Sequence, residues 1–573
     1  MNISFQIGDM QFSLIADKFR PVRGGMILSG ANVSLRLPFQ PKRYYRHGWQ
    51  SWSLAAWLDP SRPVLPINPP LIRPQADDPA YILSKHHGGS WLGGVDAPDG
   101  DVVLLAALGQ DAHVELDGQT LRGWYEQGNP RIISSTYPKH LDLSWGNGEW
   151  FVANGPEQAV FAHYVAWLSE TLGKGHSSTA ASALRLRSHR PDIVPTLLRD
   201  VLAGAPPRVW CSWYSLYTGI SEERLLNILK DLGDLPFDVF QIDDGWQKAI
   251  GDWEANEKFP SGMVNFAARI RATGRTPGLW LAPLLAVPSS SLFRQHPDWL
   301  LHDEKGGLVS AGFNWNEPLY ALDTTHPAAL DWLAALMKKV RAWGYDYLKL
   351  DFLYAGALPG KRHKDMPREA AYRHGLKVLR EAMGEAYFLT CGAPILPSLG
   401  LCDGMRVGPD VASAWNNPSE SDWLYNFSGL GTRNAIRTSL NRLWLGPLVH
   451  TDPDVVYFHT RKNRMTHEQM QLLQDLSLIT GYKATSDLPS WLTPTEREAL
   501  REFLNAKPSI QRTGRYTFLI DDREVDFSET SNLPTPVPRW FGELWSWLAS
   551  SPTILRARNW YINRMASRNT KYQ

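Results

Sequence analysis

The sequence has few cysteines, no charge imbalance and no long apolar run. Only Cys211, Cys391 and Cys402 occur among 573 residues, which argues against a disulfide framework. Lysine and arginine number 59 against 58 acidic residues, so no field of one sign favours nucleic acid or an acidic membrane surface. No uninterrupted apolar stretch reaches the length needed to span a bilayer. A small neutral substrate fits these exclusions best.

Signals for export, metals and cofactors are also missing. The N-terminus lacks a basic segment followed by an apolar one, so it is not a signal peptide, and we expect a cytoplasmic protein. The 16 histidines form no His-x3-His pattern and the cysteines no Cys-x2-Cys pattern, so we predict no metal. No glycine-rich phosphate loop is found, and no cofactor is expected. No nucleophile elbow supports a cysteine protease built on Cys391.

Tryptophan and proline, by contrast, are abundant, with 25 and 41 residues. A tryptophan ring offers a flat apolar face and one N–H donor, which suits the C–H faces and hydroxyl edges of sugars. We expect most of these rings to lie in the core and a few to contact a ligand.

Changes of pattern along the chain predict three domains, since one core cannot serve 573 residues. Residues 1–190 have strand-like alternation, as at 33–37, and favour an N-terminal antiparallel β-sandwich. Residues 191–485 alternate apolar runs with helical segments, which predicts a (β/α)8 TIM barrel, with a doubly wound sheet as the alternative. Residues 486–573 are expected to form a small C-terminal antiparallel β-domain. Predicted barrel strands are 208–213, 237–242, 277–281, 345–350, 387–390, 405–407 and 443–449.

Two barrel helices have clear boundaries. Ser221 followed by two glutamates favours a helix start, and Gly233 a helix end. A second helix is expected from about Pro327, with Gly344 after it.

Aspartates recur where the predicted barrel strands end, which is where barrel enzymes place catalytic groups. Lys349 and Asp351 are two residues apart, so on a strand they share one face. The lysine would favour the ionised form of Asp351, as a glycosidase nucleophile requires. A buried structural ion pair, or a helix cap, is the alternative for Asp351.

Asp410 follows Gly408-Pro409, which would aim it over the barrel mouth. Near other carboxylates its proton would be held more tightly, which suits a general acid; a turn aspartate after proline is the alternative. Asp243 and Asp244 can accept hydrogen bonds from neighbouring hydroxyls, or simply form a strand-end turn. Trp246 and Trp280 are either sugar platforms or core residues.

Taken in order, these strand ends resemble the α-galactosidases of glycoside hydrolase family 36, in clan D. The matching segments are QIDDGW at 241–246, GLWLAP at 278–283, YLKLD at 347–351, Cys391-Gly392, RVGPD at 406–410 and DPD at 452–454, with GWQSWS at 48–53 near the N-terminus. The resemblance spans nearly the whole chain. It implies a β-sandwich, a catalytic barrel and a C-terminal β-domain, and a retaining mechanism.

The resemblance also implies roles for individual residues. Asp351 matches the nucleophile and Asp410 the acid/base. Asp243 and Asp244 match the pair that binds O4 and O6 of galactose. The positions implied to line the site are Trp246, Trp280, Lys349, Cys391, Gly392, Arg406 and, from the sandwich, Trp49 or Trp52.

Departures from the family pattern leave alternatives open. Ala393-Pro394 follows Gly392 where many members have glycines, so N-acetylgalactosamine remains a possible substrate besides galactose. The segment 314–316 lacks an arginine of longer relatives, which leaves the outer subsites open. A raffinose-synthase-like transglycosylase, a Schiff-base aldolase using Lys349 and a non-catalytic sugar-binding protein are the rival functions. We expect an α-galactoside or oligosaccharide as the small-molecule partner; a homo-oligomer stays open.

Overall fold

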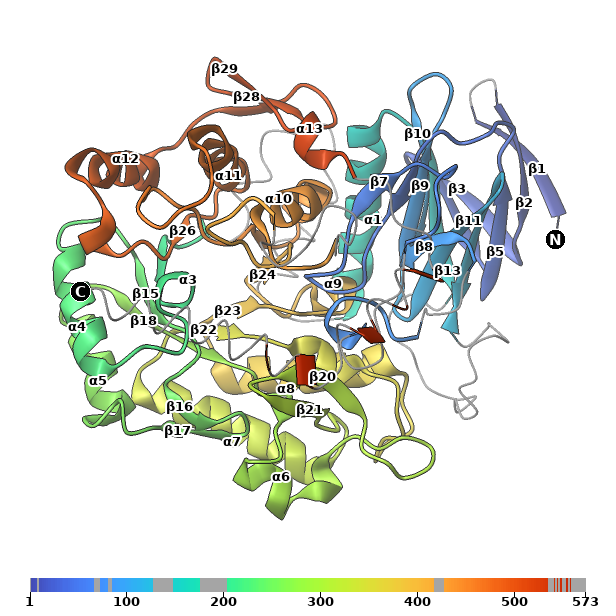
Figure 1. The fold of residues 1–573 in the computed structure, drawn as a ribbon. Helices are drawn as coiled ribbons and strands as arrows, with labels where there is room; N and C mark the ends of the chain where they lie inside the picture. The colour runs from blue at the N-terminus through green and yellow to red at the C-terminus, as the bar shows by residue number, and fades with distance from the viewer. Residues whose placement is uncertain are drawn as a thin grey trace.

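The structure is a computed structural model, and it describes residues 2–7, 10–65, 73–80, 85–126, 148–175, 204–416 and 427–533, with isolated positions between 540 and 557. The expected boundary between residues 190 and 191 lies outside the described residues, as does most of the chain beyond 533. Several layers are seen in Figure 1: N-terminal sheets on the right, strands and helices at the centre, and a small sheet at the top.

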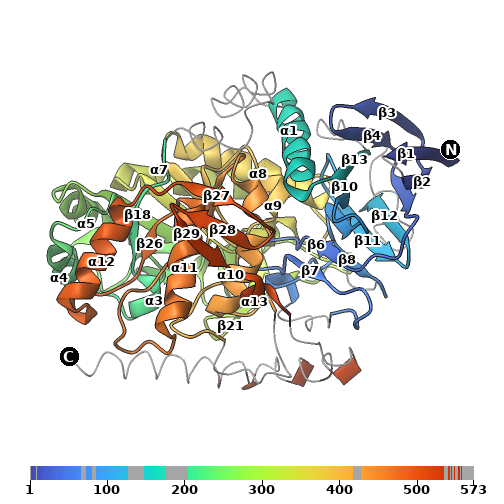
Figure 2. The same ribbon diagram turned by 90° about the horizontal axis from the view of Figure 1, so that it is seen from above.

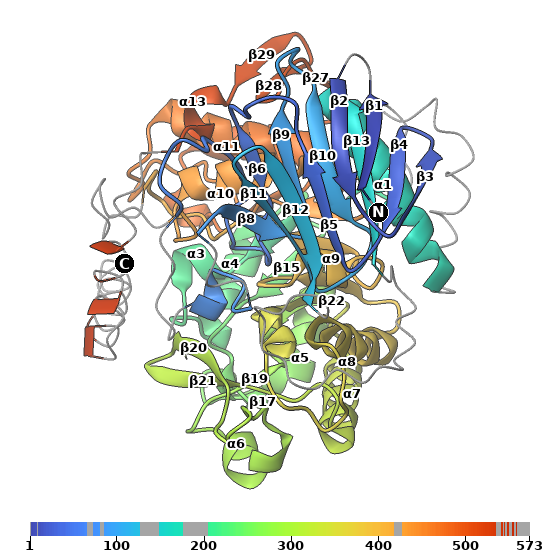
Figure 3. The ribbon, with the colours of Figure 1, turned by 90° about the vertical axis from the view of Figure 1, so that its right-hand side faces the viewer.

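Two antiparallel sheets form the N-terminal part. One has six strands in the order β1-β2-β5-β12-β11-β8, and the other seven in the order β3-β4-β13-β10-β9-β6-β7. In the side view of Figure 3 these strands face the viewer. Their bounds are β1 Asn2–Ile7, β2 Met10–Ile15, β3 Lys18–Val22, β4 Gly25–Ser29, β5 Asn32–Arg36, β6 Tyr44–Arg46, β7 Ala56–Leu58, β8 His87–Ser90, β9 Leu92–Asp96, β10 Val102–Ala107, β11 Ala112–Asp117, β12 Thr120–Tyr125 and β13 Glu149–Gly155.

A helix follows these strands where the sequence suggested only β-structure. Helix α1 (Glu157–Gly175) begins directly after β13. Its buried residues Val160, Tyr164 and Leu168 are spaced by four and belong to the apolar core. The prediction of continuous β-structure was therefore wrong over this segment, because its apolar positions repeat at helical rather than alternating spacing.

The central sheet has eight strands in the order β25-β24-β23-β22-β18-β15-β14-β26, and every neighbouring pair is parallel. The sheet curls, since Val456, just beyond β25, forms a parallel bridge with Thr485 of β26 at the other edge. The strand bounds are β14 Val209–Cys211, β15 Val239–Ile242, β18 Thr276–Leu281, β22 Tyr347–Leu350, β23 Tyr387–Thr390, β24 Gly404–Arg406, β25 His450–Asp452 and β26 Ala484–Thr485.

Helices pack around this sheet, as the view from above in Figure 2 shows. The longer ones are α4 Glu222–Leu232, α5 Gly262–Arg271, α7 Pro327–Trp343, α8 Arg368–Met383, α10 Thr432–Leu440 and α11 His467–Thr480. The boundary predictions are confirmed: the Ser221 hydroxyl accepts a hydrogen bond from the N–H of Arg224, and Gly233 caps the same helix. Gly344 is left-handed after α7, at a φ of 99°.

Short elements complete the central part. They are α3 Trp213–Leu216, β16 Gln247–Ala249, β17 Asp252–Ala255, β19 Leu285–Ala286, α6 Ser291–Gln295, β20 Ser310–Asn314, β21 Glu317–Ala321, α9 Ile395–Ser398 and the 3-10 helices at Leu353–Ala357 and Leu443–Leu445. The last of these corrects the strand predicted at 443–449, since the strand is β25, which begins at His450. A short apolar run does not by itself distinguish a strand from a buried helical turn.

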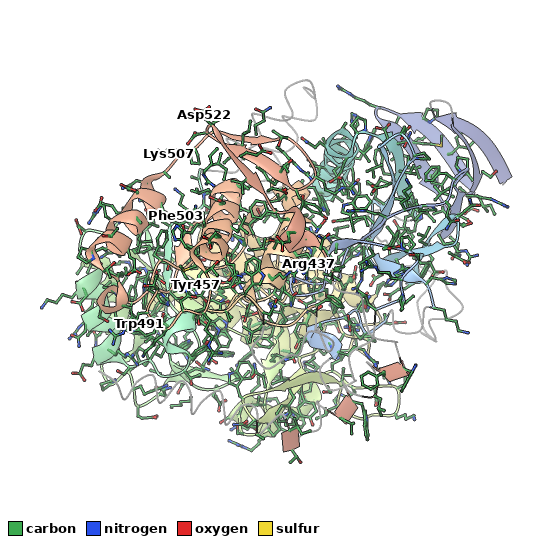
Figure 4. The ribbon with its side chains drawn as sticks, turned by 45° about the horizontal axis from the view of Figure 1, so that its top comes forward. Arg437, Tyr457, Trp491, Phe503, Lys507 and Asp522 are labelled. Carbon is green, nitrogen blue, oxygen red and sulfur yellow. The ribbon has the colours of Figure 1, made fainter. Side chains whose placement is uncertain are left out.

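The C-terminal part has one helix and a three-stranded antiparallel sheet. Helix α12 (Pro494–Asn505) precedes β27 (Ile510–Arg512), β28 (Thr517–Ile520) and β29 (Arg523–Asp526), and the short helix α13 (Ser528–Ser531) follows. In Figure 4, Asp522 lies at the outer tip of the β28–β29 turn, and Arg437 of α10 lies closer to the centre. None of the described helices is both long and apolar enough to cross a bilayer.

Candidate active site

The carboxyl ends of the parallel strands bring the predicted residues to one edge of the sheet. Asp351 directly follows β22, Asp243 follows β15, and Asp410 lies four residues beyond β24. Because parallel strands end at the same edge, residues distant in sequence meet there. Burial raises the pKa of Asp410 and the charge of Asp351 adds to the rise, so the two carboxyl groups interact.

Both oxygens of Asp351 accept hydrogen bonds. The N–H of Phe352 lies 2.7 Å from Oδ1, and the indole Nε1 of Trp280 lies 3.0 Å from Oδ2. Donors of this kind stabilise a carboxylate and fix its direction. The arrangement holds Asp351 as an oriented base or nucleophile. Trp280 itself is only 2% exposed, so its indole positions the carboxylate and does not serve as an open sugar platform.

Lys349 pairs with a different carboxylate from the one we predicted. Its Nζ lies 3.0 Å from Oδ2 of Asp243. Strand β22 ends at Leu350 and Phe352 is left-handed at a φ of 53°, so Asp351 lies in a bend where strand alternation no longer applies. Burial lowers the pKa of Lys349, but Asp243 more than offsets this, and the pKa is raised. A lysine that stays charged is a poor Schiff-base nucleophile.

Asp243 and Asp244 lie in different environments. Oδ2 of Asp243 accepts from Lys349 and, at 2.7 Å, from Nε2 of Gln241. Asp244 accepts from Nε2 of Gln247 at 2.6 Å on one oxygen, and from Nε1 of Trp315 at 2.7 Å on the other. Burial raises the pKa of Asp244 to about 6, although both hydrogen bonds oppose the shift. Each Asp244 oxygen keeps a lone pair for a further donor.

Arg406 connects the carboxylates at the ends of β24 and β25. Its Nη1 lies 3.1 Å from Oδ1 of Asp410, its Nε 3.1 Å from Asp452, and its Nη2 2.7 Å from Asp454. A guanidinium group presents its donors in a rigid planar fork, so it fixes all three carboxyl groups relative to one another. Arg406 therefore positions Asp410, a role beyond the place lining the site that the resemblance implied.

Asp410 is the most exposed acid of this group, with 37% of its side chain accessible. Partial removal from water raises its pKa; Arg406 and Lys349 oppose the shift, while Asp351 and Asp243 add to it. A carboxyl group that holds its proton yet reaches solvent is suited to general acid catalysis.

Asp454 is fully buried beside Asp410. It accepts hydrogen bonds from the Tyr214 hydroxyl and, at 3.0 Å, from the N–H of Val411. Burial raises the pKa of Asp454 to about 7, and the charge of Asp410 contributes to the rise.

Two of the predicted tryptophans lie away from the site. Trp246 is completely buried, donates to the carbonyl of Trp280 at 3.0 Å, and packs against Trp253 and against Trp343 of α7. Trp49 donates to Glu369 at 2.9 Å and lies under the guanidinium of Arg368. Neither indole leaves a face open for a sugar, so Trp246 fits its alternative as a core residue, and Trp52 is the member of the Trp49-or-Trp52 pair that stays a candidate.

Trp52, Cys391 and Gly392 lie next to the bend after β22 that carries Asp351 and Phe352. The half-buried ring of Trp52 lies 5.1 Å from that of Phe352, measured between centroids, and touches Gly392. Gly392 is left-handed at a φ of 52°, and its carbonyl accepts from the N–H of Tyr354. Burial and the nearby charge of Asp351 raise the pKa of the Cys391 thiol, so it stays protonated.

Three site residues had been missed as individual candidates: Trp315, Tyr214 and Asp454. Asp454 belongs to the matched DPD segment but had no role. Trp315 lies at the two-residue turn between β20 and β21, and Asn316 beside it was the one local signal of a hairpin. Tyr214 carries no sequence signal, since its position beside Arg406 depends on the packing of α3.

Metal-ligand spacing occurs once among the described residues, away from these strand ends. Asp78, His113 and Glu126 place ligand atoms within 4.8 Å of one another. The Nη2 atom of Arg368 lies 2.9 Å from Asp78 and 2.5 Å from Glu126. A guanidinium already neutralises these carboxylates, so the group is a buried ion-pair cluster.

Comparison with known proteins gives a consistent result. The family profile described as melibiase matches residues 194–386. The fold is similar to that of an α-galactosidase from Thermus thermophilus solved with 4-nitrophenyl α-D-galactopyranoside, at 45% identity and a TM-score of 0.80, covering 92% of this chain and 100% of that one. The same enzyme solved with stachyose gives 46% identity and a TM-score of 0.76 over 88% and 99% of the two chains.

More distant relatives match over shorter stretches. An α-galactosidase of Geobacillus stearothermophilus is 30% identical over 184 residues, which is 30% of this chain and 24% of that protein. An α-galactosidase of Escherichia coli is 26% identical over 247 residues, 40% of this chain and 33% of that protein. The chain thus matches a quarter to a third of the length of these two relatives.

Proposed function

Because the chain belongs to the α-galactosidases of glycoside hydrolase family 36, we propose that it hydrolyses terminal, non-reducing α-galactosides with retention of configuration. The observation that carries the proposal is the contrast between two interacting carboxyl groups. Asp351 is held in one orientation by two N–H donors, whereas Asp410 is partly exposed and burial raises its pKa. A nucleophile must be held in a fixed direction, and a general acid must retain its proton.

The reaction proceeds in two displacements. Asp351 attacks the anomeric carbon while Asp410 protonates the departing glycosidic oxygen, and a galactosyl ester forms on Asp351. Asp410, now ionised, takes a proton from water, which attacks the anomeric carbon and frees Asp351. Arg406 holds Asp410 during both steps, and Trp280 holds Asp351. Retention requires the two carboxyl groups about 5–5.5 Å apart.

Substrate recognition is assigned to the neighbouring residues. Asp243 and Asp244 accept hydrogen bonds from O4 and O6 of the sugar, and Trp52, Cys391 and Gly392 line the side near Asp351. The complexes of the Thermus enzyme with an aryl galactoside and with stachyose support this substrate class. The three cysteines are free, which supports a cytoplasmic location.

The domain organisation forms part of the same proposal. We assign the two N-terminal sheets to a β-sandwich, the central region to a closed (β/α)8 barrel, and residues beyond 485 to a small β-domain. The bridge between Val456 and Thr485 supports closure of the barrel.

Asp351→Gly tests the mechanism. The variant should lose at least about 1,000-fold in kcat, because the covalent step is removed, and added azide should restore turnover and yield a galactosyl azide of β configuration. Wild-type rates on 4-nitrophenyl α-glycosides of galactose, N-acetylgalactosamine and glucose identify the sugar. Product analysis with a sugar acceptor separates hydrolysis from transfer. A variant that retains full activity, or a wild-type enzyme inactive on all three glycosides, would contradict the proposal.

A further inference from the structure

The β20–β21 hairpin places a tryptophan in an unusual backbone conformation at the site. Asn314 pairs with Glu317, so Trp315 and Asn316 alone form the turn. Their φ angles are 49° and 63°, both in the left-handed region. Turns of this kind ordinarily use asparagine and glycine, and a bulky residue there is a rare exception. A tryptophan kept at such a position points to a task for its side chain.

The indole of Trp315 contacts both ends of the site. Its Nε1 lies 2.7 Å from Oδ2 of Asp244. Its ring lies 5.1 Å from that of Phe352, which follows the nucleophile, and 6.2 Å from that of Trp280, measured between centroids. Trp315 is half-buried, so part of it faces solvent.

The hairpin itself is firmly held. The Oε2 and Oε1 atoms of Glu317 accept from the N–H and hydroxyl of Ser289, at 2.9 and 2.6 Å. The hydroxyl of Tyr354 donates to the carbonyl of Ala311 at 2.6 Å. These anchors fix the turn, and through it the direction from which the indole reaches Asp244.

We propose that Trp315 is a positioning and specificity-determining residue, whose indole N–H orients Asp244 towards a sugar hydroxyl and whose ring forms a wall beside the nucleophile. The inference rests on the proposed function. Asp243 is already bonded to Lys349 and Gln241 on one oxygen. Asp244 keeps a lone pair on each oxygen, and so has the greater capacity to bind hydroxyl groups. Trp315 fixes which way those lone pairs point.

Trp315→Phe tests the proposal, since it keeps a ring and removes the N–H. Values of kcat/KM are measured for 4-nitrophenyl α-D-galactopyranoside and for its 4-deoxy and 6-deoxy analogues. The variant should lose about tenfold or more on the galactoside, as expected for a hydrogen bond to a charged group. The loss should shrink to within about threefold on the analogue that lacks the hydroxyl bound by Asp244.

Two control variants distinguish the effect of losing the indole N–H of Trp315 from the effect of a changed turn and from the effect of losing any tryptophan. Asn316→Gly relaxes the turn and retains the indole, and should leave the ratios among the three substrates unchanged. Trp299→Phe removes an indole from the separate apolar cluster of Leu292 and Leu300 and should also leave them unchanged. An equal loss on all three substrates in Trp315→Phe, no loss, or the same selective loss in either control overturns the role of Trp315. A wild-type enzyme inactive on the galactoside would instead reject the proposed function.

Discussion

The position of Asp410, the proposed general acid, depends on Arg406. Its guanidinium contacts Asp410, Asp452 and Asp454 at once, and its Nη1 also lies 3.5 Å from the hydroxyl of Tyr214. A planar fork cannot move towards one partner without leaving another. The position of Asp410 is thus linked to a carboxylate, Asp454, that substrate does not need to touch.

Asp454→Asn tests this link. The new amide would place an N–H₂ group against Arg406 or against the Tyr214 and Val411 donors, so the fork should shift. We expect kcat to fall by about 10- to 100-fold, in the range of misplaced positioning groups. Burial raises the pKa of Asp410 and the charge of Arg406 opposes the rise; once Asp454 no longer neutralises Arg406, that charge should act more strongly on Asp410 and lower its pKa. A general acid must be protonated, so the basic limb of the kcat profile should move to lower pH.

The matching control is Asp403→Asn, which removes a half-buried carboxylate that pairs with Arg380 and accepts from the N–H of Phe388, at the opposite end of β24 from Arg406. It should leave the pH profile unchanged. A basic limb that stays in place in Asp454→Asn would show that Asp454 does not influence the protonation of Asp410.

At this scale the sequence places candidate aspartates at the strand ends but does not identify all of their partners. Asp351 and Asp410 became candidates because strand ends can be located from apolar runs. The lysine was assigned to the wrong carboxylate, because its choice between Asp351 and Asp243 depends on where β22 ends. Tyr214 and Trp315 could not be assigned, since their contacts join segments far apart in the chain.

At the scale of secondary-structure elements, the backbone bends that follow the strands determine the geometry of the site. Phe352 is left-handed after β22, and Gly392 is left-handed after β23. The first bend turns Asp351 towards Trp280. The second allows Trp52 to pack against the backbone, since a Cβ on Gly392 would lie 3.0 Å from the Trp52 ring and 3.1 Å from the N–H nitrogen of Phe352.

Gly392→Ala should therefore damage the site as well as the fold. The left-handed backbone costs about 1–2 kcal/mol for any residue with a side chain, and the new methyl group also pushes on Trp52 and Phe352. We expect a KM raised about tenfold or more for an aryl α-galactoside, together with a lower unfolding temperature.

Gly274→Ala is the matched control for the cost of placing a side chain on a left-handed backbone. Gly274 has a φ of 79°, but a Cβ there meets nothing within 4 Å. It should lower the unfolding temperature to a similar extent and leave KM unchanged. Equal KM values in the two variants would mean that the contact between Gly392 and Trp52 does not affect substrate binding.

Helices and strands could be predicted from the sequence where both an apolar periodicity and clear end signals were present. The strand at 387–390 and the helices beginning after Ser221 and at Pro327 had apolar periodicity and clear ends. The strand predicted at 443–449 failed, because that run packs as a 3-10 turn before β25. The helix α1 was missed within a region that otherwise alternates. Short or isolated patterns depend on tertiary contacts that one sequence does not display.

The site is completed by a segment from the N-terminal sheets. Arg442 of the central region donates to the carbonyls of Gly48, Gln50 and Ser53 at 2.9 Å each. These bonds hold the loop that carries Trp52 next to Gly392. Docking of the N-terminal part is thus a condition for an intact site.

A second anchor for that docking is Glu369, at the start of α8. Its Oε1 accepts from Nε1 of Trp49 at 2.9 Å, and its Oε2 accepts from Nε1 of Trp91 at 3.0 Å and from the N–H of Asp111 at 2.6 Å. All three donors come from the N-terminal part, and Glu369 is 1% exposed. Neighbouring Arg368 bonds Asp78 and Glu126 from the same part.

Glu369→Gln should loosen this junction. Whichever oxygen becomes an amide nitrogen, at least one buried N–H then faces another donor, and a buried unsatisfied group of this kind costs about 1–3 kcal/mol. We expect thermal unfolding to begin several degrees lower than in the wild type. Lys377→Met on the same helix removes an exposed pair with Glu381, worth about 0–1 kcal/mol, and should change the unfolding temperature little. If the two variants unfold alike, the Glu369 contacts do not hold the N-terminal sheets in place, and the docking must rest on the Arg442 bonds and the apolar surface between the two parts.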